Sequence, residues 1–257
     1  MADEVLRDRR GNVVVLTINR PEARNSINAA VTAQMSEALD ELTEDPEAWV
    51  VILTGTGEKA FSAGMDLKAF AAGEGEKIIS ANGGFAGIAK RDFPKPIIAA
   101  VNGPALAGGF EIVLSCDLVV AVPHATFGIP EVKRGLVAAG GGLVRLPRRL
   151  PMAVALEMAL TGDPIDADRA FDLGLINRIV PAERLLDEAL SLAERITENS
   201  PLSVRHSKRV LRRSADVPEA EGWVISDEAY QTVFSSPDAM EGPLAFAEKR
   251  KPRWQAP

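Results

Sequence analysis

Short apolar runs, separated by polar or glycine-containing loops, mark the first half of the chain. Four of these runs predict buried strands, at residues 13–18, 49–53, 97–101 and 118–122. Between the first two, apolar positions at helical spacing predict an amphipathic helix over residues 28–43. This alternation of strands and helices favours an α/β fold with a largely buried sheet.

The pattern changes in the second half of the chain, where helical spacing dominates. A short strand is expected at residues 177–180. Helices are expected at residues 152–160, 166–173, 185–196, 201–213, 219–234 and 238–248. We therefore divide the chain into residues 1–195, which hold the core and the candidate site, and residues 196–257, a helical region expected to pack on the core or on another subunit.

Composition narrows the classes of protein that fit. The 257 residues are 46% hydrophobic, which is enough for one large core, and their net charge of −7 argues against nucleic acid or anionic lipid as a partner. Cys116 is the single cysteine, so no internal disulfide forms, and two histidines make a metal site improbable. The N-terminus lacks a signal-peptide core and no apolar run is long enough to span a membrane, so we expect a cytoplasmic protein without a membrane partner.

The segment 97–117 carries the first candidate chemistry. A strand ends at a tight Asn-Gly turn, and Gly108-Gly109 then opens a helix whose first N–H groups have no intrahelical partner. Glu111 lies three residues beyond Gly108 in an otherwise apolar stretch. Free amides beside a half-buried acid can stabilise an oxyanion and transfer a proton. The alternative is an ordinary connection followed by a glutamate on a solvated helix face.

Two further segments contain either a glycine before a helix start or a candidate carboxylate. Gly64 precedes a helix that Asp66 would cap, which gives either a second source of free amides or an ordinary helix start. Glu131 follows a proline in a loop and is either a second site carboxylate or a surface acid beside Lys133 and Arg134. Residues 71–90 contain several glycines and little periodicity, which is typical of a mobile lid or a pocket wall.

Together these motifs resemble the crotonase (enoyl-CoA hydratase/isomerase) superfamily over nearly the whole chain. The matching segments are Arg20-Pro21 with Asn25, FSAGMDL at 61–67, PKPIIAAVNGPALAGGFEI at 94–112, CDL at 116–118, FGIPEVKRGL at 127–136, the glycines at 140–142, LTG at 160–162 and AFAEKRKPRW at 245–254. The resemblance implies a spiral of ββα units with two near-perpendicular sheets. It also implies a C-terminal helical trimerisation region, with assembly as a trimer or a dimer of trimers.

The resemblance further implies the substrate and the catalytic groups. The substrate would be an acyl-coenzyme A thioester, so coenzyme A is part of the substrate and no separate cofactor is expected. The amides of Met65 and Gly108 would form an oxyanion hole. Glu111 would activate water and Glu131 would deliver a proton to Cα of a trans-2-enoyl thioester, because burial and mutual repulsion keep one carboxyl protonated.

Residues that bind coenzyme A are inferred from the same resemblance. Each of them could instead be a solvated charge or a packing residue. They are Lys59, Ala63, Asp66, Leu67 and Lys68 near the first loop, and Phe246 and Lys249 near the C-terminus, which would reach the coenzyme A of a neighbouring subunit.

Several functions stay open beside the enoyl-CoA hydratase. A carnitinyl-CoA-type dehydratase or an enoyl-CoA isomerase would use the same fold, although a pair of glutamates favours hydration or its reverse. A serine hydrolase is disfavoured because no GxSxG motif is present, and an RNA-binding protein is disfavoured by the acidic charge. The family's proline is absent from the segment 137–142, which leaves the acyl group unspecified.

Overall fold

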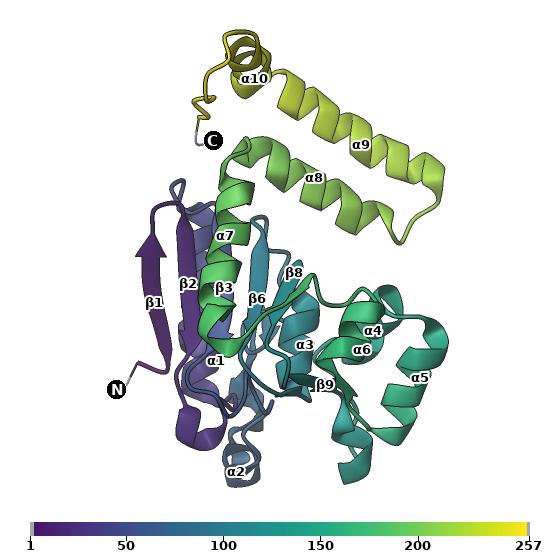
Figure 1. The fold of residues 1–257 in the computed structure, drawn as a ribbon. Coiled ribbons are helices and arrows are strands. Elements are labelled where there is room, and N and C mark those ends of the chain that lie inside the picture. The colour runs from purple at the N-terminus through teal and green to yellow at the C-terminus, as the bar shows by residue number, and fades with distance from the viewer. Residues whose placement is uncertain (1–2, 256–257) are drawn as a thin grey trace.

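A six-stranded sheet forms the centre of the computed structural model, which describes residues 3–255 (Figure 1). The strand order is β1–β2–β3–β6–β8–β11, with β1 antiparallel to β2 and all other neighbours parallel. The strands are β1 Val5–Arg10, β2 Val13–Ile18, β3 Val50–Gly55, β6 Ile97–Val101, β8 Leu118–Ala121 and β11 Arg178–Ile179. The predicted apolar runs therefore form the buried middle of this sheet.

The sequence analysis did not predict β1. Only Val5 of its residues is buried, and the rest of the strand is exposed and mostly charged. β1 is an edge strand, fixed by six residue pairs with β2 rather than by apolar burial. A charged edge strand of this kind carries no hydrophobic pattern and also discourages edge-to-edge association.

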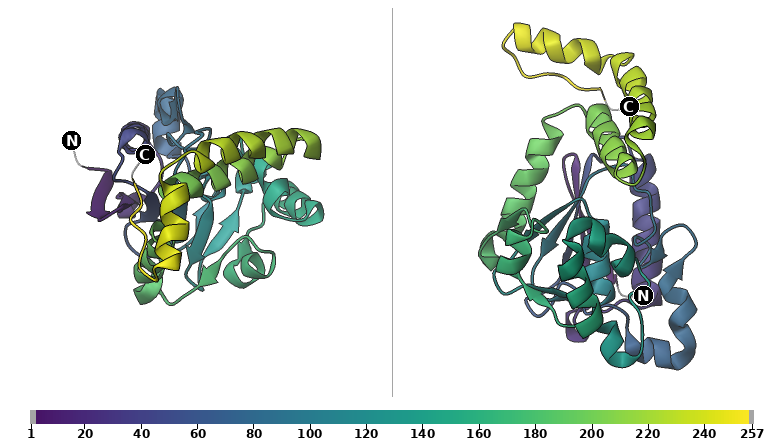
Figure 2. Two further views of the ribbon diagram at one scale, coloured as in Figure 1. Left: turned by 90° about the horizontal axis from the view of Figure 1, so that it is seen from above. Right: turned by 90° about the vertical axis from the view of Figure 1, so that its right-hand side faces the viewer.

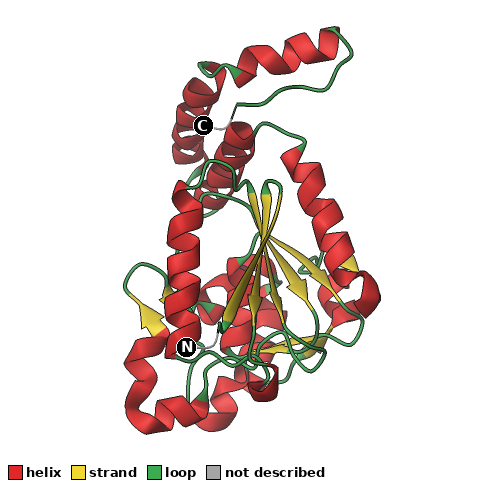
Figure 3. Cartoon of the chain, turned by 90° about the vertical axis from the view of Figure 1, so that its left-hand side faces the viewer, coloured by secondary structure: helices red, strands yellow, loops and turns green. Residues whose placement is uncertain are grey.

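Two long helices cover opposite faces of the sheet (Figure 2, right). Helix α1 Ala29–Glu44 begins where the side chain of Asn28 accepts a hydrogen bond from the Val31 amide. Helix α7 Leu185–Thr197 packs against β2, β3, β6 and β8. The buried residues of the sheet and of the helix faces against it form the hydrophobic core. Figure 3 shows the strands lying between helices.

A second, three-stranded sheet lies next to the candidate site. Its order is β10–β9–β7, with strands β7 Ala105–Leu106, β9 Thr126–Gly128 and β10 Ile165–Asp166. Strands of two or three residues are too short to produce a periodic pattern, so the sequence did not reveal them individually.

Shorter elements complete the core. They are η1 Pro21–Ala23, α2 Leu67–Ala69, η2 Phe70–Glu74, η3 Gly75–Ile78, β4 Ile79–Ser80, β5 Gly84–Phe85, α3 Gly108–Ser115, η4 Pro130–Arg134, α4 Gly142–Arg149, α5 Met152–Thr161, α6 Ala167–Asp172 and η5 Ala182–Arg184. Residues 71–90 thus form short turns and a two-stranded ribbon, β4–β5. Their proposed role as a mobile lid stays a prediction.

Three helices joined by turns make up most of the described C-terminal region, and a non-helical tail follows them. Helices α8 Pro201–Ser214 and α9 Glu219–Phe234 pack against each other, and α10 Asp238–Ala247 follows at the top of Figure 1. Helix α7 packs on the core and ends at Thr197. The division of the chain at residue 195 stays a prediction. Across residues 3–255, every helix is too short or too polar for a bilayer crossing.

Candidate active site

The start of α3 presents a free backbone amide. Ala107 precedes the helix with φ 52° and ψ −130°, a conformation that turns the chain sharply into Gly108. The turn is held by hydrogen bonds from the Leu106 amide to the Ser62 carbonyl (3.0 Å) and from the Ala107 amide to the Gly128 carbonyl (2.9 Å). As the first residue of α3, Gly108 has an N–H without an intrahelical partner.

The amide of Met65 lies beside it on a neighbouring loop. A bridge between Met65 and Ile27 uses the Ile27 amide to the Gly64 carbonyl (2.8 Å) and the Asp66 amide to the Ile27 carbonyl (2.9 Å). The bridge leaves the N–H of Met65 unused. Gly64 has φ +84°, and a Cβ atom there would lie 2.7 Å from the Gly108 nitrogen, so the two loops are in direct contact. The contact brings the segment that holds Met65 against the start of α3, and the joint use of the two amides as an oxyanion hole stays a prediction.

Glu111 lies in the first turn of α3 and is buried, with 3% of its surface exposed. Its Oε1 accepts a hydrogen bond from the Gly142 amide at 2.8 Å. Burial raises the pKa of Glu111 to about 7, and the negative charge of Glu131 acts in the same direction. The Gly142 and Gly140 amides and the Arg145 guanidinium partly offset this rise in pKa. The interpretation of Glu111 as a solvated surface residue is therefore wrong.

The glycines at 140–142 make room for this carboxylate. A Cβ atom on Gly140 would lie 2.5 Å from Oε2 of Glu111, and one on Gly142 would lie 3.1 Å from Oε1. Side chains at these positions would press on the carboxylate that the amides contact. The glycines at 140 and 142 therefore lie directly against the Glu111 carboxylate.

Glu131 comes shortly after β9, and β9 pairs with β7, the strand that leads directly into α3. This pairing brings Glu131 to the site. It lies in the turn η4, where its Oε2 is buried and has no hydrogen-bond partner within the described residues. Burial raises the pKa of its carboxyl group. Of the two surface partners that the sequence suggested, Lys133 bonds to Asp163. The charge of Arg134 partly offsets the rise in the pKa of Glu131. The geometry supports a site carboxylate over a surface acid.

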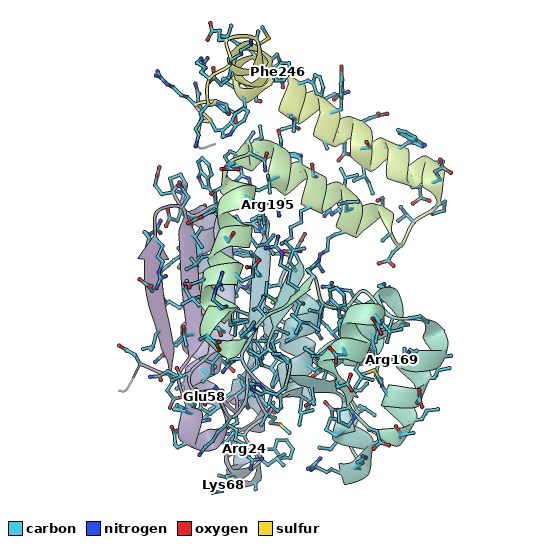
Figure 4. All side chains as sticks on the ribbon, in the orientation of Figure 1. Arg24, Glu58, Lys68, Arg169, Arg195 and Phe246 are labelled. Atoms are coloured by element: carbon cyan, nitrogen blue, oxygen red, sulfur yellow. The ribbon has the colours of Figure 1, made fainter. Side chains whose placement is uncertain are left out.

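The residues expected to bind coenzyme A fall into two groups. Lys59, Leu67 and Lys68 are exposed and Ala63 is half-buried, and Lys68 lies at the lower end of the molecule in Figure 4. The Asp66 carboxylate caps α2 by accepting from the Lys68 and Ala69 amides. The contacts of this group with a ligand stay predictions.

Phe246 and Lys249 form the second group and lie far from the first. Phe246 is 88% exposed on α10, at the opposite end of the molecule from Lys68 (Figure 4). Lys249 follows α10 and is exposed as well. A single chain does not bring these residues to the candidate site.

Phe85 is a site residue that the sequence analysis missed. A Cβ atom on Gly108 would lie 2.4 Å from two carbons of the Phe85 ring, so the ring lies directly against the start of α3. Phe85 belongs to β5, a two-residue strand in the glycine-containing segment. Its neighbours gave no periodic signal that could have identified it.

Comparison with known proteins identifies the family of this chain. The family model for enoyl-CoA hydratase/isomerase matches residues 8–257. Two curated relatives, the carnitinyl-CoA dehydratases of Salmonella arizonae and Citrobacter koseri, are each 43% identical over 99% of both chains.

Solved structures give the same result. An enoyl-CoA hydratase from Mycobacterium tuberculosis H37Rv superposes with a TM-score of 0.95 at 48% identity, covering 100% of both chains. A carnitinyl-CoA hydratase from Mycobacterium avium superposes with a TM-score of 0.79 at 47% identity, also over 100% of both chains. The predicted crotonase-like fold class is confirmed. The chain belongs to the enoyl-CoA hydratase/isomerase family and is an enzyme of the crotonase type.

Proposed function

We propose that the chain is an enoyl-CoA hydratase, which adds water reversibly and in syn geometry to a trans-2-enoyl-CoA thioester. Two adjacent backbone amides and two glutamates with raised pKa values support this proposal. Hydration needs such a set, because negative charge develops on the thioester oxygen while a water loses one proton and Cα gains another.

Each group has a defined part in the proposed reaction. The thioester oxygen accepts hydrogen bonds from the Met65 and Gly108 amides, which stabilise the enolate. Glu111 takes a proton from water as the water oxygen bonds to Cβ. Glu131 donates a proton to Cα, so the elements of one water molecule are added across the double bond. Loss of one such amide donor typically lowers kcat by roughly 10²- to 10³-fold.

One observation carries the proposal: Glu111 is buried and the charge of Glu131 raises its pKa further. Two carboxyl groups that interact in this way hold one proton between them over a range of pH. Such a pair contains a base and an acid at the same time. An isomerase that moves a proton between carbons needs only one such group.

A carnitinyl-CoA-type dehydratase is the second candidate, because relatives of that name are 43% identical over 99% of both chains. Dehydration runs the same steps in reverse, with Glu131 removing the Cα proton and Glu111 protonating the departing hydroxyl. The two candidates differ only in the acyl group. Enoyl-CoA isomerisation is the less favoured alternative.

We also propose that coenzyme A is held as part of the substrate, with no separate cofactor. Lys59 and Lys68 are exposed on the segments on either side of Met65, and their ammonium groups suit its phosphates. Exposed apolar side chains on α9 and α10, such as Phe234, Met240 and Phe246, support association with further copies of the chain. The family resemblance favours a trimer or a dimer of trimers. In that assembly Phe246 would reach the coenzyme A of a neighbouring subunit.

A spectrophotometric assay tests the proposal. Purified protein is mixed with trans-2-enoyl-CoA esters of increasing length, starting with crotonyl-CoA, and with a crotonyl-CoA that bears a γ-trimethylammonium group. Loss of the conjugated-thioester absorbance with straight chains, abolished in Glu111→Gln and Glu131→Gln, is the expected result. Loss with the trimethylammonium ester alone favours the dehydratase, and no loss with any ester contradicts both candidates.

A further inference from the structure

We infer that Arg20 is a positioning residue for the oxyanion hole, acting on the Met65 amide through the Asp66 carboxylate. This inference rests on the proposed function, because it assigns Met65 a role as donor to the thioester oxygen. Arg20 follows β2 and is separated from Asp66 by 46 positions in the sequence, yet the two side chains form an ion pair with both groups only 14% exposed.

The Arg20 guanidinium joins three acceptors at one nitrogen. Its Nη1 donates to the Ser26 carbonyl at 2.7 Å, to the Ser26 hydroxyl at 3.1 Å and to Asp66 Oδ2 at 3.0 Å. On the other side, Nε lies 3.4 Å from Oε2 of Glu4. Because the guanidinium is planar and bonds to both Ser26 and Asp66, it holds the loop after β2 and the loop before α2 at a fixed separation.

Asp66 transmits this restraint to the amide. Its Oδ2 meets Arg20, while its Oδ1 accepts from the Lys68 and Ala69 amides at the start of α2. Its own backbone N–H donates to the Ile27 carbonyl at 2.9 Å. The N–H of Met65 shares a peptide plane with the Gly64 carbonyl, which accepts from the Ile27 amide at 2.8 Å. The bonds of Arg20 to Ser26 and Asp66 hold the two segments of this bridge together, and the bridge sets the direction of the Met65 N–H.

Arg20 is itself held in place by Asn25, which is 1% exposed. The Arg20 amide donates to Asn25 Oδ1 at 3.0 Å, and the Asn25 amide donates to the Arg20 carbonyl at 2.8 Å. Asn25 also donates from Nδ2 to the Ala60 carbonyl at 2.8 Å. Arg24 and Asn25 both have left-handed φ values, 53° and 54°, a conformation that such a network must maintain. The loop that carries Arg20 is therefore tied to the segment that leads to Met65.

Loss of the Arg20 side chain should weaken stabilisation of the transition state more than binding of the substrate. An amide that is displaced by a fraction of an ångström still permits the coenzyme A part of the substrate to bind, but it stabilises the enolate less. We expect Arg20→Ala to lower kcat by about 10- to 100-fold. The KM for crotonyl-CoA is expected to stay within about threefold, since the lost interaction is made in the transition state.

A spectroscopic probe separates this role from general destabilisation. An arylacryloyl-CoA binds with its conjugated thioester in the oxyanion hole, and hydrogen bonds to the carbonyl shift its absorbance to longer wavelength. We expect a smaller shift in Arg20→Ala than in the unmodified protein. Arg20→Lys, which keeps the charge but loses the planar fork, is expected to give an intermediate shift and kcat.

The matched control is Arg178→Ala, which breaks a half-buried ion pair with Glu188 at the far edge of the central sheet. The control should match the unmodified protein in kcat and in spectral shift. Equal values of both quantities for Arg178→Ala, Arg20→Lys and Arg20→Ala would overturn the inference. An unmodified protein that neither hydrates crotonyl-CoA nor shifts the probe would instead contradict the proposed function.

Discussion

Replacing Glu111 with glutamine removes a buried carboxyl group whose ionised form opposes folding. Glutamine keeps an oxygen that can accept the hydrogen bond from the Gly142 amide. The variant should therefore lose activity and gain stability at alkaline pH, a combination typical of groups retained for function.

The magnitude follows from the pKa in the folded chain. Burial raises the pKa of Glu111 from 4.5 to about 7. This rise of about 2.5 pKa units corresponds to about 3 kcal/mol of folding free energy. Below pH 4.5 the carboxyl is protonated in both folded and unfolded chains, so it imposes no penalty. The penalty grows as pH rises from 4.5 to 7 and is complete above pH 7.

Urea unfolding at pH 5 and pH 8.5 measures the effect, at one protein concentration so that assembly contributes equally. The stability gain of Glu111→Gln over the unmodified protein should be larger at pH 8.5 than at pH 5 by up to about 3 kcal/mol. Glu194→Gln makes the same substitution at an exposed position of α7 and should show no such difference. An equal gain at both pH values would refute the raised pKa.

Three further predictions concern the same site and the core. Glu131→Gln should lower kcat by about 10²-fold or more while crotonyl-CoA still binds, as measured by steady-state kinetics and calorimetry. Gly140→Ala should lower kcat and change the pH–rate profile, because its Cβ would lie 2.5 Å from a Glu111 oxygen, whereas Gly222→Ala should leave both unchanged. Phe110→Ala should lower the free energy of unfolding by about 3–5 kcal/mol, because the Phe110 ring is fully buried, and a loss under 1 kcal/mol in urea unfolding would contradict this packing.

The sequence predicted the buried strands and the helices because the side chains that face the core are apolar and recur at regular spacing. It did not predict β1, whose charged residues pair along an edge, or the short strands β7, β9 and β10. Those elements are specified by pairing with distant strands, and such pairing leaves no local pattern. The family resemblance supplied the two-sheet architecture that periodicity alone could not.

The candidate site, too, could be predicted from the sequence only in part. Gly108 and Glu111 could be identified because a glycine turn and a lone acid stand out within an apolar run. The contacts of Glu111 with Gly140 and Gly142 join segments about 30 residues apart, and the Arg20–Asp66 pair joins segments 46 residues apart. Contacts between distant segments depend on the folded chain, so residue spacing along the sequence could not reveal them.

The most direct test of the proposed hydration follows the atoms of water into the product. Crotonyl-CoA is incubated with the protein in H₂¹⁸O and, separately, in D₂O, and the coenzyme A ester formed is examined by mass spectrometry and NMR. The account predicts a 3-hydroxyacyl-CoA with ¹⁸O at C3 and one deuterium at C2, and no product with Glu111→Gln or Glu131→Gln. Deuterium incorporation without ¹⁸O, or release of free coenzyme A, would contradict it.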